Sequence, residues 1–123
     1  SLHGSHQVLP HEDLHALLKN LPSRSFLTSH PSFAYFCEEY HLQQISVEIS
    51  GKAPLAREVK TLLDQAEEDL VKVAIAQPQF SAKGLNLIAK KLQIPVEMVD
   101  PYTKKYPESL THLAKILKAP KGQ

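Results

Sequence analysis

The sequence predicts a Rossmann-like three-layer α/β domain, with a central parallel sheet of about four strands and helices on both faces. Short apolar runs alternate along the chain with stretches in which apolar residues recur at helical spacing. Strands that alternate with helices of roughly 10 to 15 residues are joined by right-handed crossovers, which place the strands in parallel. The length of 123 residues fits one such domain.

The first half of the chain predicts a helix, a strand, a second helix and a second strand. The first helix begins at His11 and ends before Pro22, and its apolar residues share one face: Leu14, Leu17, Leu18 and Leu21. A strand over residues 25–28 follows. Pro31 is expected at the first position of the next helix, whose apolar face contains Phe33, Phe36, Cys37 and Tyr40. Residues 42–47 form the second predicted strand.

The second half repeats this alternation after a predicted loop over residues 50–54. The third helix has its apolar face at Leu55, Val59, Leu62, Leu63 and Ala66. Residues 71–76 predict a buried strand, Ser81 is expected to cap a fourth helix, and residues 96–99 form a fourth strand. A last helix starts at about residue 107. We therefore expect one domain over residues 11–118, a flexible lead-in or cloning remnant over 1–10, and a frayed tail over 119–123.

The composition argues against several classes of function. Fourteen basic and thirteen acidic residues give a net charge of +1, so the chain lacks the broad positive field that nucleic acids require. One cysteine, Cys37, excludes an internal disulfide, and its position on an apolar helix face predicts core packing. The four glycines cannot form a dinucleotide-binding or Walker loop, and a Gly-x-Ser-x-Gly elbow is absent, so we do not expect an enzyme.

Polar residues follow each predicted strand, where the carboxyl ends of parallel strands share one edge. These residues are His30, Glu48, Gln77 and Asp100. Imidazole nitrogen and carboxylate oxygen together suit zinc, manganese or iron, so this edge is a candidate divalent-metal site. The alternative is that strands end in polar residues because loops are exposed to water.

A second group of histidines lies near the start of the chain. His11 and His15 are four residues apart and share one face of the first predicted helix, with His3 and His6 upstream. They form either a secondary metal-binding cluster or a set of solvated or cloning-derived histidines.

Four sequence segments resemble the motifs of one known family, and they occur in the same order. His30 to Phe36 matches His-x-x-Phe-x-Tyr-Phe, and Glu48 to Pro54 matches Glu-x-x-Gly-Lys-x-Pro. Residues 76–81 are similar to a Glu/Gln-Pro-Gln-Phe-Ser segment, and residues 99–101 to a Leu-Asp-Pro segment. The sequence thus resembles the metal-binding solute-binding proteins of ABC transporters.

This resemblance implies two α/β lobes joined by a long helix, with a metal ion in the cleft between them. The chain matches the C-terminal lobe. The resemblance assigns His30 as a metal ligand and Asp100 as a further one, with Glu48 and Tyr35 in supporting positions beside the ligands. The remaining ligands, usually two histidines, would come from an N-terminal lobe. We expect zinc, with manganese or iron as alternatives, and weak binding by the single lobe.

The resemblance also implies partners and a location. The protein would deliver metal to an ABC permease from the periplasm or the extracellular surface, and we expect no signal segment within this chain. The surface around His30, Tyr35 and Pro101 would be exposed without the other lobe, which predicts self-association. Two alternatives remain open at this stage: a small Rossmann-like enzyme or ligand-sensing domain, and a structural domain that interacts through its helix faces.

Overall fold

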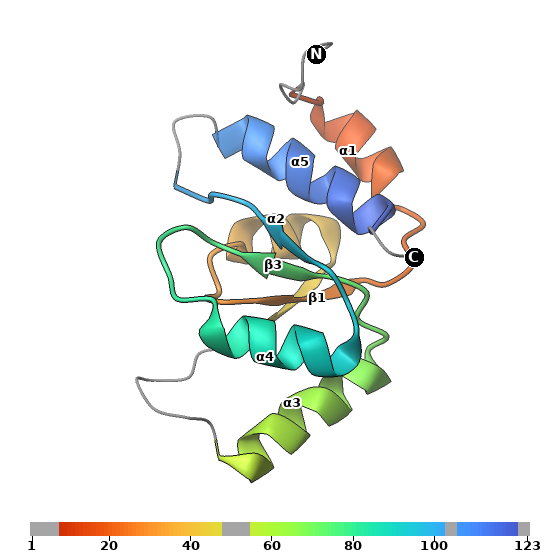
Figure 1. Ribbon diagram of the computed structural model, residues 1–123. Coiled ribbons are helices and arrows are strands. Elements are labelled where there is room, and N and C mark those ends of the chain that lie inside the picture. Colours follow the sequence, from red (N-terminus) through yellow and green to blue (C-terminus); the bar gives the residue numbers. More distant parts are fainter. Residues whose placement is uncertain (1–7, 48–54, 103–105, 121–123) are drawn as a thin grey trace.

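The computed structural model describes residues 8–47, 55–102 and 106–120. These ranges contain a four-stranded parallel sheet and five helices (Figure 1), which confirms the predicted fold class. In chain order the elements are α1 (His11–Leu17), β1 (Ser25–Thr28), α2 (Ala34–Tyr40), β2 (Gln43–Ser46), α3 (Ala56–Glu68), β3 (Ala74–Ala76), α4 (Lys83–Leu92), β4 (Val96–Met98) and α5 (Tyr106–Lys118).

The strands lie in the order β2-β1-β3-β4. The chain builds β2 on one side of β1 and then crosses to place β3 on the other side, with Leu27 beside Ala74 and Thr28 beside Ile75. Right-handed crossovers in opposite directions put the connecting helices on opposite faces of the sheet. The strand order therefore reverses between β1 and β3, and open α/β sheets bind ligands at the carboxyl ends of such a pair.

Two hydrophobic clusters cover the two faces of the sheet. One packs α1, α2 and α5 against a face that includes Phe26, and the other packs α3 and α4 against a face that includes Leu27. Phe26 and Leu27 are consecutive in β1 and fully buried, because neighbouring side chains of a strand point to opposite faces. Burial of one such side chain stabilises the fold by roughly 1.5–3 kcal/mol.

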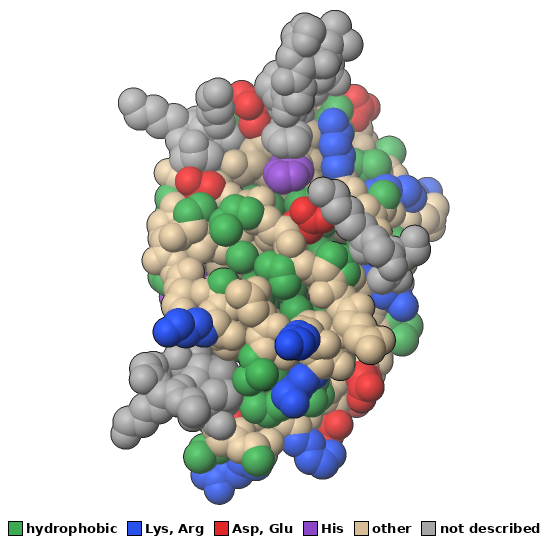
Figure 2. Space-filling model, in the orientation of Figure 1, with side chains coloured by type: hydrophobic (Ala, Val, Ile, Leu, Met, Phe, Trp, Pro, Cys, Tyr) green, Lys and Arg blue, Asp and Glu red, His purple; other side chains and the backbone are tan. Residues whose placement is uncertain are grey.

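The sheet is buried at its centre and partly exposed at its edges. All residues of β1 and β3 are buried, whereas the edge strand β4 exposes Val96 and Met98. Figure 2 shows hydrophobic side chains gathered in the middle of the face on which, in Figure 1, the chain crosses between α4 and α5. Because helices cover both faces of the central strands, β1 and β3 contain consecutive apolar residues.

Pro31 does not begin a helix, contrary to the sequence prediction. Helix α2 begins at Ala34, after a non-helical segment in which Phe33 is fully buried and donates its N–H to Gln44 Oε1 at 3.1 Å. This long-range bond satisfies a backbone donor that a helix start would otherwise leave free. The segment between His30 and Phe33 is therefore fixed by β2, the neighbouring strand.

Two other boundaries differ from the prediction by more than one residue. Helix α1 ends at Leu17 because the carbonyl groups of Leu18 and Lys19 accept hydrogen bonds from Arg24. Strand β3 begins at Ala74, since Leu70 has a left-handed backbone conformation (φ 57°) and residue 71 donates its N–H back to the end of α3. The predicted loop over residues 50–54 lies outside the described residues.

Cys37 packs in the core, as predicted from its helix face. Its side chain is 6% exposed, and burial raises the pKa of the thiol to about 12, despite an opposing contribution from a backbone hydrogen bond at Gln44. The thiol is therefore protonated at neutral pH, the form that is inert as a nucleophile.

Candidate metal half-site at the carboxyl edge of the sheet

His30 lies just beyond β1, and a side chain from the neighbouring strand holds its backbone. Gln77 follows β3 directly and is 1% exposed. Its Oε1 accepts the N–H of His30 at 3.0 Å, and its Nε2 donates to the His30 carbonyl at 2.6 Å. The Thr28 hydroxyl donates to the same carbonyl at 2.5 Å. The buried amide thus pairs with His30 as a backbone peptide group of β3 would, so His30 is placed by the sheet itself.

The imidazole of His30 is also positioned, by an aromatic ring from the segment between β3 and α4. Its ring stacks on Phe80, with 4.2 Å between ring centroids and an interplanar angle of 16°. The ring of Tyr102, beyond β4, is tilted against the Phe80 ring, with 6.3 Å between the two centroids. Stacking of this kind restricts rotation of the histidine side chain, as a metal ligand requires.

Asp100 lies at the same edge, beyond β4. Its Oδ1 accepts hydrogen bonds from the Gln79 side chain at 2.6 Å and from the Tyr102 backbone N–H at 2.9 Å. The Tyr102 and Ser32 hydroxyl groups are 3.2 Å apart, which connects the segment after β4 to the segment after β1. Residues 77–80 therefore lie between His30 and Asp100 and contact both.

The other predicted site residues have different outcomes. Glu48 lies outside the described residues. Tyr35, in the first turn of α2, is 84% exposed and Tyr102 is 59% exposed, whereas Pro101, which we expected to be exposed, is buried. Within the described ranges, no three His, Cys, Asp or Glu side chains lie where they could hold one metal ion. His30 and Asp100 are thus at most two ligands of a site that needs others.

Sequence reasoning placed Gln77 at this edge but missed its role, and it missed Gln79 and Phe80. All three belong to the segment 76–81 that carried one of the four family motifs. The only signal in the sequence was that motif, because the partners of these side chains are 21 to 50 residues away along the chain.

The opposite end of the sheet has its own polar side chain, Arg24, which precedes β1. Its guanidinium group donates to four carbonyl groups at the ends of α1 and α2: Leu18 (2.8 Å), Lys19 (3.5 Å), Tyr40 (2.6 Å) and His41 (2.8 Å). A shallow pocket of about 200 Å³ lies beside it, lined by His15, Leu18, Lys19, Arg24, Tyr40 and His41. Since the guanidinium nitrogens are engaged with backbone, this end of the sheet serves the fold.

The fold and the edge residues together fit one lobe of a metal-binding solute-binding protein. The family described as zinc-uptake complex component A periplasmic, ZnuA, matches residues 10–119, and the chain therefore belongs to this family. This confirms the resemblance seen in the sequence motifs. None of the described helices is long and apolar enough to cross a membrane.

Individual relatives agree with this assignment. The high-affinity zinc uptake system protein ZnuA of Haemophilus influenzae is 28% identical over 92 residues, which cover 73% of this chain and 27% of that protein. The zinc-binding protein AdcA of Streptococcus pyogenes serotype M3 is 27% identical over 92 residues, covering 73% of this chain and 18% of AdcA.

A solved structure is similar over most of the chain. The zinc-bound structure of a ZnuA deletion mutant that lacks residues 138–173 has a TM-score of 0.75 and 37% identity, covering 91% of this chain and 44% of that one. This chain therefore spans less than half the length of the relatives that it matches. The comparisons give no support for the alternative of a small enzyme or a ligand-sensing domain.

Proposed function

We propose that this chain takes part in zinc capture for ABC-transporter uptake, with His30 and Asp100 as two ligands of a metal site at the carboxyl edge of the sheet. The observation that carries the proposal is the segment Gln77–Phe80, which holds His30 through two backbone hydrogen bonds and a ring stack, and Asp100 through one side-chain hydrogen bond. Two candidate ligands that follow different strands are thus positioned by one short segment that begins at the buried Gln77, in a chain of the zinc-uptake family.

The donor set suits zinc. Neutral imidazole nitrogen and carboxylate oxygen are both ordinary zinc ligands, and a tetrahedral site takes four. Both hydrogen bonds of Asp100 go to Oδ1, so we assign Oδ2 to the metal. Zinc is the metal named for the relatives, and manganese or iron would be favoured only if oxygen ligands completed the site.

The remaining ligands would come from outside this chain. We place this chain in the position of the C-terminal lobe, opposite an N-terminal lobe that would supply histidines. A metal ion bound by both lobes would favour their closed arrangement, and separation of the lobes would release it. We propose that the closed form delivers zinc to an ABC permease from the periplasm or the cell surface. The role is binding and release, with no catalytic step.

The half-site can be tested by calorimetric titration with zinc. The background protein carries His3→Ala, His6→Ala and His11→Ala, so that the histidines near the start of the chain do not contribute. We expect weak zinc binding in this background. Both His30→Ala and Asp100→Asn should reduce it by about tenfold or more; Asn keeps an oxygen acceptor for Gln79 and Tyr102 but loses the carboxylate.

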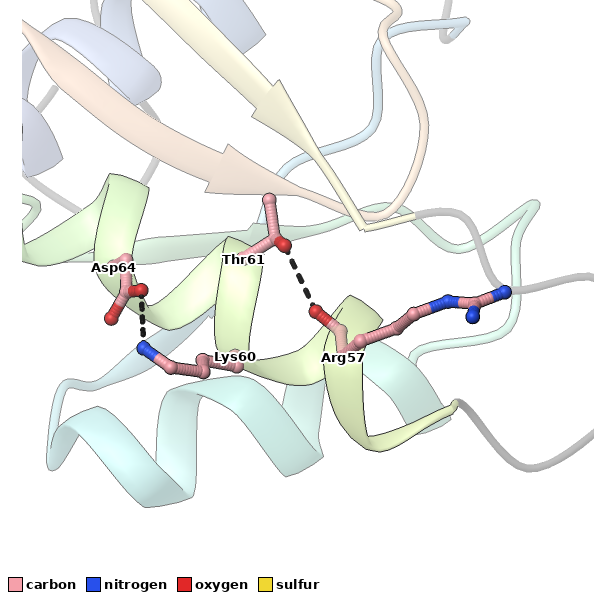
Figure 3. A network of polar contacts seen from close by, with 4 residues as sticks. All are labelled: Arg57, Lys60, Thr61 and Asp64. Carbon is pink, nitrogen blue, oxygen red and sulfur yellow. Dashed lines mark hydrogen bonds and ion pairs between the residues drawn. The ribbon is translucent and has the colours of Figure 1, made fainter.

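Asp64→Asn is the matched control for Asp100→Asn. Asp64 is an exposed carboxylate on α3 whose partner is Lys60 at 2.8 Å (Figure 3), and it has no contact with the edge segment among the described residues. Its substitution should leave zinc binding within about twofold. Unchanged zinc affinity in both His30→Ala and Asp100→Asn would show that the edge is not a metal site.

A further inference from the structure

His11, His15 and Glu39 lie together on the surface where α1 meets α2, away from the carboxyl edge of the sheet. The two histidines come from successive turns of α1, and Glu39 comes from the last turn of α2. The imidazole rings of His11 and His15 are stacked, with 6.0 Å between their centroids and 25° between their planes. His11 Nε2 is 3.6 Å from Glu39 Oε2.

These distances are close to those of two ligands of one zinc ion. Ligand atoms that lie 2.0–2.1 Å from a tetrahedral zinc are about 3.4 Å from each other. The separation of His11 Nε2 and Glu39 Oε2 is 3.6 Å, so an ion could bind between them with a small adjustment of exposed side chains. A His-x-x-x-His pair on one helix face is also the spacing with which zinc proteases hold their metal.

Tyr40 contacts the His11 ring at the nitrogen that does not face Glu39. Its hydroxyl is 2.9 Å from His11 Nδ1, and its ring is 5.4 Å from the His11 ring. When Nδ1–H donates to the phenol oxygen, the lone pair lies on Nε2, the nitrogen that faces Glu39. Histidine ligands of metals are commonly held in this way, with one nitrogen bonded to a neighbour and the other to the ion.

We propose that His11, His15 and Glu39 form a second zinc site on this lobe, independent of His30 and Asp100. Two ligand atoms are already in place. His15 completes the set by rotation of its side chain toward the ion, because in the present arrangement three ligands do not yet converge. Water would fill the fourth position. His11 and Glu39 are 60% and 54% exposed, so zinc can reach the site directly from solvent.

The site can be tested by zinc titration in a protein that lacks the half-site and the first two histidines, with His3→Ala, His6→Ala and His30→Ala. We expect this protein to bind one zinc ion. His11→Ala should abolish that binding within the range of the titration, and His15→Ala and Glu39→Gln should each weaken it by about tenfold or more. Tyr40→Phe should weaken it by about tenfold while the stoichiometry stays at one.

Glu12→Gln is the matched control for Glu39→Gln, because it removes one negative charge from the first turn of α1. It should leave zinc affinity within about twofold. A second measurement, long-range ¹H–¹⁵N spectra of the histidine rings, should show zinc-dependent shifts at Nε2 of His11 in the same protein. Absence of binding, or equal losses in Glu12→Gln and Glu39→Gln, would overturn the proposal. Either result leaves the test of His30 and Asp100 unaffected, because that test uses a protein without His11.

Discussion

The two ends of the sheet use polar side chains in different ways. At the amino end, Arg24 places its charged group on four backbone carbonyl groups of α1 and α2. At the carboxyl end, the amide side chains of Gln77 and Gln79 bind the backbone of His30 and the carboxylate of Asp100. The bonds of Arg24 all go to backbone carbonyl groups, whereas the bonds at the carboxyl end hold His30 and Asp100, the two residues proposed to bind zinc there.

The difference separates structural from positioning interactions. Helix carboxyl ends leave carbonyl groups without partners, and a cation there both bonds them and offsets the helix dipole. The bonds of Arg24 at the amino end therefore stabilise the fold. Neutral amides at the other end contribute less to stability, but they fix two candidate ligands without competing charge. We therefore expect substitutions at the amino end to change the free energy of unfolding, and substitutions at the carboxyl end to change zinc binding more than stability.

The largest effect is expected for Arg24→Met, which keeps part of the apolar stem and removes the guanidinium group. Loss of the bonds to four carbonyl groups should lower the free energy of unfolding by about 3 kcal/mol. Urea denaturation measures this change. Zinc affinity of the carboxyl edge, measured in the protein with His3→Ala, His6→Ala and His11→Ala, should stay within about twofold, since the side-chain bonds of Arg24 in the described structure go to the ends of α1 and α2.

Arg57→Met is the control for this substitution. Arg57 is exposed on α3, and its side chain extends away from the Lys60–Asp64 pair and the Thr61 hydrogen bond (Figure 3). The change should alter stability by less than about 0.5 kcal/mol. Equal changes in the free energy of unfolding for Arg24→Met and Arg57→Met would contradict the structural role assigned to Arg24.

Gln77→Leu should have an intermediate effect on stability. Leu has a volume similar to that of Gln but cannot make the two hydrogen bonds to His30. The free energy of unfolding, measured by urea denaturation, should therefore fall by about 2 kcal/mol. Zinc binding should weaken as well, because the His30 backbone loses its partner in β3. Gln77→Glu serves as a comparison: a protonated carboxyl group can both accept and donate, so this variant should recover stability as the pH falls.

Gln79→Ala should have the smallest effect on stability. The bond to Asp100 is exposed, so the free energy of unfolding should change by less than about 0.5 kcal/mol. Zinc affinity should nevertheless fall by about tenfold, because Asp100 loses the side chain that orients it. A clear loss of stability with unchanged zinc affinity would contradict the assignment of the carboxyl end to zinc binding and of the amino end to stability.

The alternation of strands and helices was predictable because periodicity of apolar residues reflects burial directly. The strand over residues 25–28 has the predicted bounds, and the fold class is confirmed. Helix and strand ends were less accurate where distant groups decide them: Gln44 keeps Phe33 out of α2, and Arg24 takes the carbonyl groups after α1. Such bonds join residues that lie 6 to 17 positions apart and leave no periodic signal.

The predicted position of His30, Gln77 and Asp100 at one edge of the sheet agrees with the structure, the contacts among these residues were not predicted, and metal binding by them stays a prediction. That His30, Gln77 and Asp100 share one edge follows from parallel strand direction alone. The order of the strands, which places β3 between β1 and β4, could not be derived from local sequence, and this order makes residues 77–80 the contact between His30 and Asp100. The proximity of His11 to Glu39 likewise depends on how two helices pack.

The pairing of Gln77 with the His30 backbone has a consequence for the timescale on which the edge can change. The His30 amide hydrogen is bonded to a buried side chain that is anchored at the end of a central strand. Its exchange with solvent should therefore require separation of β1 from β3, and its protection should approach that of the central strands themselves. In the proposed zinc site the His30 backbone would therefore stay in place while the ion binds and leaves, and release of the ion would come from motion of the other ligands.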